Sequence, residues 1–474
     1  MKKIKLSDYK LKKGILKSPW SEIFNVLDEN ESWFYGRLPE YLWIGLIIEH
    51  YGRSKSLKIL INFMKFIASN IPSITTPAWS IIIAQNDENR NLFFEKLFSI
   101  IDKNILMPLT LLQFDDNFIS FIKYYDSFAS FESRFETIQL MLGKLCNHQS
   151  EDSTDIRYIV LSYAIFSGKL NVQRSQIEQL EKYHKLNHTD EEMRMIRPMI
   201  RATELIIIGN ISIIDNFEYL EYFWDCVGKN TNCDCFYIVQ KEGEKVDYNT
   251  YLSEITNKLK YYTELIKIDT NDEKLFVLTS ISVFCLKRFK ELIEHNLFNA
   301  ISGRSILRGL IENYIIMEYL ILAENEHSNI WRDYQLYGIG NLNLIIKRND
   351  EQENGYKSKN INFNYLSLLV NEFIDEQFID IDLNYFNKDN IRTKSEKTNN
   401  KDLYNIFDYC SNYEHSLWGA IRESTLLKCN NPAHRYHTLP DIDDLQQCSD
   451  VWGDCLFIMN KILELLKKEF GYKR

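Results

Sequence analysis

The stretch ISGRSILRGLIENYIIMEYL, residues 301–320, decides the fold predicted for this chain. Ile, Leu and Tyr surround its charged residues almost all the way round, which is typical of a helix buried inside a helical bundle. Arg304, Arg308 and Glu312 are four residues apart, so a helix places them on one stripe within roughly 80° of arc. The question is why a helix face that is otherwise apolar carries three charges, since an unpaired buried charge is costly.

Helix-favouring composition extends over the whole chain of 474 residues, which is 45% hydrophobic and 26% charged, with only 17 Gly and 8 Pro. Few helix breakers and long Leu/Ile/Lys/Glu runs favour helices over sheets. The sequence therefore predicts an all-α protein: an N-terminal helical array (1–228), a polar linker (229–247) and a C-terminal multi-helix bundle (248–474).

Apolar periodicity sets the expected elements. The linker contains one short extended candidate, CFYIVQ (235–240), and the polar segment 387–402 reads as a mobile linker. Helices are expected over 37–52, 54–70, 87–103, 116–128, 131–146, 155–167, 173–185, 190–208, 212–227, 249–267, 272–296, 298–323, 326–347, 362–379, 402–428 and 441–470.

Charge and cysteine usage narrow the classes of function. A net charge of −10 and a pI of about 5.6 argue against a general nucleic-acid-binding surface but leave a local basic pocket open. No apolar run approaches the ~20 residues that span a bilayer, so no membrane association is expected. The nine cysteines form no regular framework, which indicates reduced thiols and a cytoplasmic protein. We expect a homo-oligomer.

The charged stripe has two interpretations. Arg308 and Glu312 can pair within the helix, which leaves Arg304 to be satisfied elsewhere. In the structural interpretation, the three form a salt-bridge network that fixes helix register. In the functional one, an arginine holds a phosphate or carboxylate in a polar pocket of the bundle.

A second set of polar residues lies in YNIFDYCSNYEHSLWGAIRES, residues 404–424. Asp408, Asn412, His415 and Arg422 recur at helical spacing, opposite an apolar face. They form either the solvated face of an ordinary amphipathic helix or a lining for the cavity that holds the arginines. In the second case His415 acts as general base or ligand, and the other three contact the substrate.

The loop CNNPAHRYH (429–437) offers Cys429, His434 and His437 as three N/S ligands. No CxxC pair anchors them, so the sequence predicts neither a metal site nor a cofactor, and Arg435 is instead a candidate phosphate contact. Cys410 and Cys448 are candidates for a fourth ligand of this loop. A separate and equally loose group consists of Cys226, Cys233 and Cys235.

Short motifs give the chain a resemblance to a known family. The stretch at 301–320, then WRDYQLYGIG and YCSNYEHS, is similar to the all-helical DUF5677 family over about residues 249–430. The family's Arg-x-Leu-x-Glu element matches Arg308 to Glu312, and its Ser-x3-His element matches Ser411 to His415. The resemblance implies that Arg308, Glu312 and His415 belong together. It also suggests a defence- or stress-associated locus and a partner protein from that locus.

A weaker similarity links the chain to the HEPN ribonucleases, which pair an Arg and a His on one helix. Arg288 and His295 have an allowed spacing, although Phe289 stands where that family has a small polar residue. No phosphate loop, dinucleotide fingerprint, GxSxG elbow or HExxH helix is present.

Two functions therefore stay open. One is a HEPN-like, metal-independent ribonuclease or toxin that acts on RNA. There, Arg304 or Arg308 binds the scissile phosphate beside Glu312, and His415 is the base. The other is a non-catalytic helical sensor or scaffold whose N-terminal array binds a partner protein. A ribonuclease needs His415 and an arginine at one accessible phosphate, whereas a scaffold buries or separates them.

Overall fold

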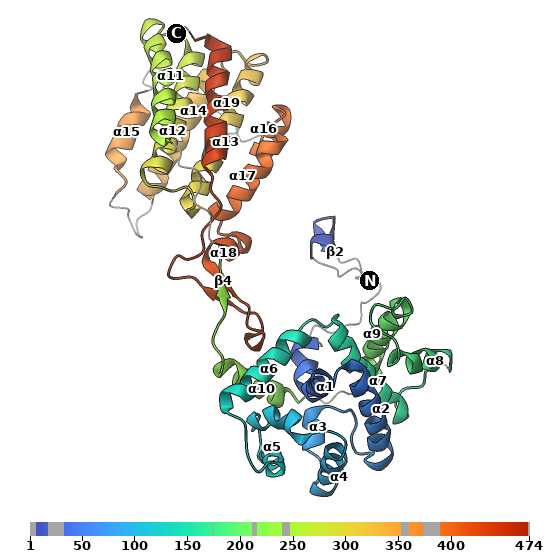
Figure 1. Ribbon diagram of the computed structural model, residues 1–474. Helices are drawn as coiled ribbons and strands as arrows, with labels where there is room; N and C mark the ends of the chain where they lie inside the picture. The colour runs from blue at the N-terminus through green and yellow to red at the C-terminus, as the bar shows by residue number, and fades with distance from the viewer. Residues whose placement is uncertain are drawn as a thin grey trace. The chain divides into compact units, whose positions relative to one another are not determined.

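The computed structural model describes residues 6–17, 33–172, 174–210, 216–238, 247–351, 360–372 and 389–472. The all-α prediction is confirmed, because helices dominate the described residues and the strands form two small sheets (Figure 1). β1 (Lys10–Lys12) pairs with β2 (Ile15–Lys17), after η1 (Leu6–Asp8). The second sheet has the order β3 (Cys235–Phe236), β4 (Leu426–Cys429), β5 (Thr438–Pro440).

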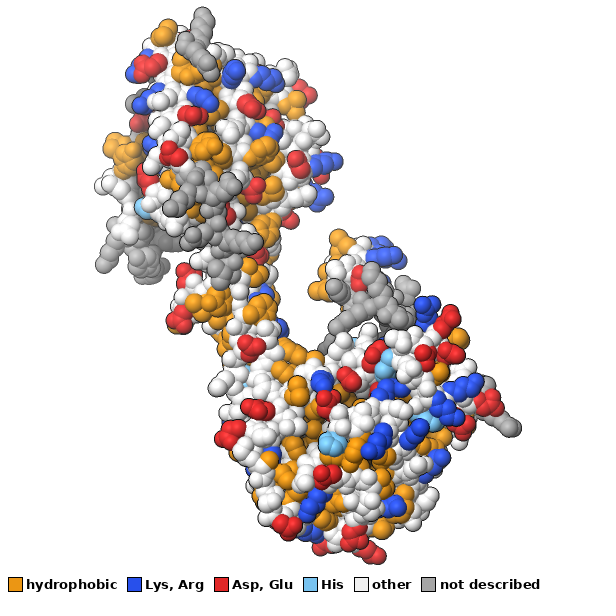
Figure 2. All heavy atoms as spheres, in the orientation of Figure 1, with side chains coloured by type: hydrophobic (Ala, Val, Ile, Leu, Met, Phe, Trp, Pro, Cys, Tyr) orange, Lys and Arg blue, Asp and Glu red, His pale blue; other side chains and the backbone are white. Residues whose placement is uncertain are grey.

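The chain divides into two compact units. The N-terminal unit comprises Met1–Phe236 and Lys428–Thr438, and the C-terminal unit comprises Tyr237–Leu427 and Leu439–Arg474. The sequence segmentation placed 428–438 in the C-terminal bundle, whereas these residues pack with the N-terminal unit. Lys/Arg and Asp/Glu side chains are interspersed over the visible face of each unit (Figure 2). Among the described residues, none of the helices is both long and apolar enough to cross a membrane.

The N-terminal unit is built around α1 (Leu38–Tyr51), where every residue from Leu38 to Ile48 is buried. A helix that is apolar all round belongs at the centre of a core, and α1 packs against α2, α6 and α7. Asn86, Asp115, Ser130 and Ser150 accept backbone N–H groups as side-chain N-caps. The remaining elements are η2 (Trp33–Arg37), α2 (Arg53–Asn70), α3 (Trp79–Ile83), α4 (Asp87–Phe98), η3 (Lys103–Leu111), α5 (Asp116–Ser120), η4 (Phe121–Tyr124), α6 (Phe131–Leu145), α7 (Glu151–Phe166), α8 (Arg174–Tyr183), α9 (Met193–Asn210), α10 (Phe217–Lys229) and η6 (Pro432–His434).

The C-terminal unit is a helical bundle around α13 (Ile301–Glu324), the helix that contains the charged stripe. It packs against α12, α16, α17 and α19 (Figure 1). Its apolar residues Leu307, Leu310 and Ile311 lie in the core. The other helices are α11 (Tyr248–Ile268), α12 (Glu273–Glu294), α14 (Ile330–Glu351), α15 (Phe363–Asn371), α16 (Ile391–Lys397), α17 (Lys401–Glu414), α18 (Trp418–Thr425) and α19 (Trp452–Phe470).

Three sequence predictions in the C-terminal unit were wrong in detail. The single helix expected over 402–428 is broken after Glu414: His415 is the C-cap of α17, Ser416 has φ 49°, and α18 leads directly into β4. The helix expected from 441 begins only at Trp452. Within the segment expected to be mobile, α16 packs on α13 and buries Ser395. The predicted helix end at 372–379 falls largely outside the described residues.

Candidate metal centre

Four metal-ligand side chains meet in the N-terminal unit. The ligand atoms of Cys233, Cys429, His434 and His437 all lie within 4.8 Å of one another. Two thiolates and two imidazoles are a common ligand set for tetrahedral zinc, and four protein ligands are typical of a structural site. From the sequence, Cys233 belongs to a separate loose group and no metal site is predicted. The structure supplies Cys233 as the fourth ligand.

Backbone hydrogen bonds bring the two parts of this centre together. β3 pairs antiparallel with β4, with Cys235 opposite Cys429, and the Asn430 N–H donates to the Asp234 carbonyl at 2.7 Å. The Cys429 N–H donates to the His437 carbonyl at 2.9 Å, which closes the loop that follows β4. This pairing places Cys233, just before β3, beside the loop that contains the other three ligands.

The loop reverses direction immediately after η6. Arg435 (φ 54°) and Tyr436 (φ 51°) both adopt left-handed backbone, which costs a non-glycine residue on the order of 1–3 kcal/mol. The two strained residues turn the chain so that His437 returns beside Cys233, with 3.3 Å between its Nε2 and the Cys233 Sγ. Strain of this kind concentrates at functional sites, and here it serves to bring a ligand atom inward.

Neighbouring backbone groups orient His434 for metal binding. Its Nε2 lies 3.0 Å from the carbonyl oxygens of both Gly228 and Thr231, so we assign the ring proton to Nε2. The lone pair of Nδ1 then faces the Cys233 Sγ at 3.2 Å. A carbonyl that fixes the non-ligating nitrogen is the usual support for a metal-binding histidine.

Two further features suit a metal. The Cys429 Sγ is buried and accepts the Asn431 N–H at 3.4 Å, a contact that favours a thiolate. Burial, with His434 and Arg435 nearby, lowers the pKa of His437 and so favours the neutral ring that can donate its lone pair.

A cavity of about 830 Å³ lies next to the centre, within the same unit. His434 and His437 line it together with Tyr35, Phe217 and Trp224. Arg435, the predicted phosphate contact, also lines the cavity, and its guanidinium stacks 4.4 Å from the centre of the Tyr35 ring. The metal centre therefore shares two side chains with the wall of a partly aromatic cavity.

Arg304 of the charged stripe lies in the interior of the C-terminal unit. Its Nη1 donates to the carbonyls of Phe298 at 3.2 Å and Ala300 at 3.3 Å, and its Nη2 donates to the carbonyl of Ser449. The side chain is also 5.8 Å from the centre of the Tyr413 ring. Backbone carbonyls thus provide the partners that the sequence left unnamed.

Arg308 and Glu312 form the intrahelical ion pair, with 3.0 Å between Nη1 and Oε2. The Arg308 Nε donates to the Ser411 Oγ at 3.1 Å, and its guanidinium lies 4.5 Å from the centre of the Phe407 ring. Both charges are partly exposed, and their contacts join α13 to α17.

The remaining predicted site residues are spread over the end of α17 and over α18. His415 is exposed, and the described contacts include no hydrogen bond or ion pair between it and Arg308 or Glu312. Asn412 donates to the carbonyl of Asp408 at 2.8 Å. Arg422 lies on the separate helix α18, where it donates to the Leu426 carbonyl at 3.1 Å, so the expected common face of one helix was wrong.

The nominal HEPN pair consists of two surface residues in the structure. Arg288 lies 3.8 Å from Glu291 one turn along α12, and His295 is the exposed C-cap of that helix.

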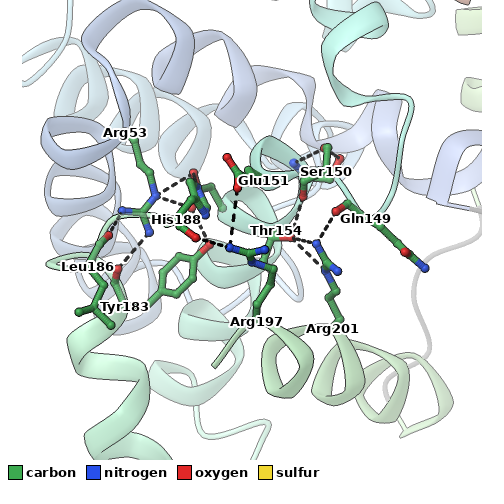
Figure 3. Close-up of polar contacts among 12 residues, drawn as sticks. Arg53, Gln149, Ser150, Glu151, Thr154, Tyr183, Leu186, His188, Arg197 and Arg201 are labelled. Atoms are coloured by element: carbon green, nitrogen blue, oxygen red, sulfur yellow. Dashed lines mark hydrogen bonds and ion pairs between the residues drawn. The ribbon is translucent and has the colours of Figure 1, made fainter. Parts of the chain in front are cut away.

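A buried carboxylate network in the N-terminal unit was not found from the sequence (Figure 3). Asp155 accepts from the Arg53 Nε at 2.9 Å and from the Tyr183 hydroxyl at 2.6 Å, and the His188 Nε2 is 3.1 Å away. Arg197 donates to the His188 carbonyl at 2.6 Å. These contacts join α2, α7, α8 with the turn that follows it, and α9. Because the Asp155 carboxylate is paired with the side chains of Arg53, Tyr183 and His188, we interpret the network as structural: it holds these helices together.

Comparison with known proteins gives one match. The family model described as "Family of unknown function (DUF5677)" matches residues 275–434, a range that contains most of α12 and all of α13 to α18 and extends through Cys429 and His434. No curated protein and no solved structure matches the chain. The resemblance to a family of unknown function is thereby supported over about a third of the chain.

Proposed function

We propose that this chain is a non-catalytic helical scaffold whose N-terminal unit contains a structural zinc ion and binds a partner protein. The four-ligand cluster of Cys233, Cys429, His434 and His437 carries the proposal. Four protein ligands leave no open position for a substrate, which argues for a structural ion and against a catalytic one. The ion would fasten the loop that contains Arg435 and so shape the adjacent cavity.

The placement of the predicted catalytic residues supports a scaffold over a ribonuclease. Arg304 is buried against carbonyls, and Arg308 is neutralised by Glu312. His415 is exposed at the C-cap of α17, and its described contacts include no hydrogen bond or ion pair to Arg308 or Glu312, an arrangement that a scaffold permits. The ribonuclease interpretation stays a prediction.

Metal analysis of the purified full-length protein tests the proposal directly. We expect one zinc ion per chain in the wild type and little or none in Cys429→Ser or His437→Ala. Cys226→Ser is the matched control, since this thiol lies in the same unit and outside the cluster. A wild-type protein that takes up no zinc after refolding with the ion would contradict the proposal.

RNA integrity in cells that express the protein separates the two functions. We expect intact RNA with the wild type and with His415→Ala and Arg308→Ala at matched protein levels. Discrete RNA fragments with the wild type, lost in both well-folded variants, would instead establish the ribonuclease.

A further inference from the structure

A third thiol lies at the edge of the metal centre without being one of its four ligands. Cys235 of β3 is directly opposite Cys429 of β4 in the antiparallel register. Directly opposite residues project from the same face of a sheet, with Cα atoms roughly 4.5–5.5 Å apart. This spacing falls within the roughly 4.4–6.8 Å that disulfides span. Cys235 therefore faces a zinc ligand at a distance suited to a disulfide.

The exposure of the thiols sets an order of reaction. Of the three thiols at the centre, the ligand Cys233 is exposed, Cys235 is partly exposed and Cys429 is fully buried. Cys235 is the accessible thiol that is not one of the four ligands. Cys285, Cys410, Cys448 and Cys455 are buried in the C-terminal unit, whereas the centre belongs to the N-terminal unit. A small oxidant can therefore react with Cys235, whereas Cys429 stays shielded from it. Bound to zinc, Cys429 is a thiolate.

We propose that the zinc centre is a redox switch, in which peroxide joins Cys235 to Cys429 as a disulfide and expels the metal. The inference rests on the proposed zinc site and adds a means of regulation. Cys429 cannot be a zinc ligand and a disulfide partner at once. Its loss leaves Cys233, His434 and His437, and three ligands hold structural zinc poorly.

The chemistry balances with a hydroperoxide as oxidant. The Cys235 thiol loses its proton to solvent and attacks one peroxide oxygen, so the O–O bond breaks and a sulfenic acid and hydroxide form. The Cys429 thiolate then leaves zinc and attacks the sulfenic sulfur, which forms the S–S bond and expels a second hydroxide. The two cysteines give up two electrons, and hydrogen peroxide becomes two molecules of water after protonation.

Release of zinc would change the cavity beside the centre. His434, Arg435 and His437 lie on the loop that the ion fastens, and the same three residues line the cavity. Without the ion, the left-handed backbone at Arg435 and Tyr436 loses the contact that offsets its strain. Oxidation would therefore weaken binding of a partner that uses this wall, and a thiol reductant with zinc would restore it.

Zinc release from the loaded full-length protein is the test. Wild type, Cys235→Ser and Cys226→Ser are treated with hydrogen peroxide, the freed metal is followed with a chromophoric chelator, and disulfides are mapped by peptide mass spectrometry. We expect release in the wild type and in Cys226→Ser, together with a Cys235–Cys429 disulfide, and loss of the rapid release in Cys235→Ser. A reductant should reverse the reaction.

Two results would overturn the switch while leaving the zinc site intact. One is equally fast zinc release from Cys235→Ser. The other is a disulfide map that shows only Cys233 joined to Cys235. By contrast, failure of untreated wild type and of all variants to bind zinc would reject the site itself, so the two proposals fail in different ways.

Discussion

Arg304 and Arg308 are one helical turn apart on α13, yet they have different surroundings. Arg304 is 1% exposed and bonded to three carbonyls, whereas the Arg308 side chain is 24% exposed and paired with Glu312. We expect Arg304→Ala to lower the free energy of unfolding by about 3 kcal/mol or more, because buried carbonyls lose their donors. Arg308→Ala should cost about 1 kcal/mol or less. Urea unfolding of both variants provides the comparison, and equal losses would contradict the structural assignment of Arg304.

Glu40 is a buried carboxyl that gives stability a pH dependence. Burial raises its pKa to about 7, although the hydroxyl and backbone N–H of Ser80 favour the ionised form. Because its pKa is higher in the folded than in the unfolded state, protonated Glu40 favours the folded protein. This contribution to the free energy of unfolding is complete below pH 4.5, the ordinary pKa, and is lost as the pH rises through 7.

The pKa shift of Glu40 corresponds to about 3 kcal/mol. We therefore expect Glu40→Gln, which cannot ionise, to gain stability relative to the wild type by up to that amount between pH 5 and pH 8. Chemical denaturation at the two pH values measures the difference. An unchanged gap between the two proteins would show that Glu40 ionises normally.

At the scale of residues, local spacing predicted some contacts and not others. The pairing of Arg308 with Glu312 follows from four-residue spacing on a helix. The partners of Arg304 are carbonyls at 298, 300 and 449, and the last belongs to a segment that only tertiary folding brings near. The Asp155 network could not be predicted from the sequence, because Arg53, Tyr183 and His188 are far apart along the chain and form no motif.

Two glycines of α13 give a matched pair of tests at the scale of elements. A Cβ on Gly303 would lie 2.2 Å from the Leu297 carbonyl oxygen and 3.2 Å from the Val451 Cγ2, whereas one on Gly309 would meet nothing within 4 Å. Gly303→Ala should lower the free energy of unfolding by about 2 kcal/mol or more, because backbone must move. Gly309→Ala should raise it by about 0.5–1 kcal/mol, since alanine favours a helix. Thermal melts of both variants check the two signs.

Element prediction worked where periodicity was long and failed where a helix ended without a breaker. The existence of α11 to α14 was predicted with small errors at their ends. The break between α17 and α18 falls at His415–Ser416, where neither Gly nor Pro marks it and the apolar pattern continues. The Leu417 N–H donates to the Asn412 carbonyl there and Ser416 adopts left-handed backbone, so a local helix C-cap that usually contains glycine is made here by serine.

Removal of zinc should affect the two units unequally, because all four ligands lie in the N-terminal unit. With a chelator we expect the melting transition of the N-terminal unit to fall by about 2–4 °C for each kcal/mol of lost binding. The transition of the C-terminal unit should not move. Calorimetry with and without chelator is the measurement, and Cys429→Ser, which lacks a ligand, should not respond. A shift of both transitions would contradict assignment of the ion to one unit.

The metal centre could not be assembled from the sequence. Cys429, His434 and His437 are close along the chain, but Cys233 and His437 are 204 residues apart. No local pattern joins ligands at that distance, and only the pairing of β3 with β4 brings them together. The fold class follows from composition and periodicity, whereas a site built from remote segments depends on topology.

The return of Lys428–Thr438 to the N-terminal unit has a consequence for synthesis of the chain. A ribosome makes the N-terminal helices first, and a domain usually folds as soon as its residues have emerged. Here the segment Lys428–Thr438 of the first unit is made only after residues 237–427 of the second unit, so the nascent N-terminal unit stays incomplete while most of the bundle helices are translated. Truncation before residue 428 should therefore prevent soluble expression of the first unit itself, even though the residues that this unit then lacks, Lys428–Thr438, lie in the last fifth of the protein.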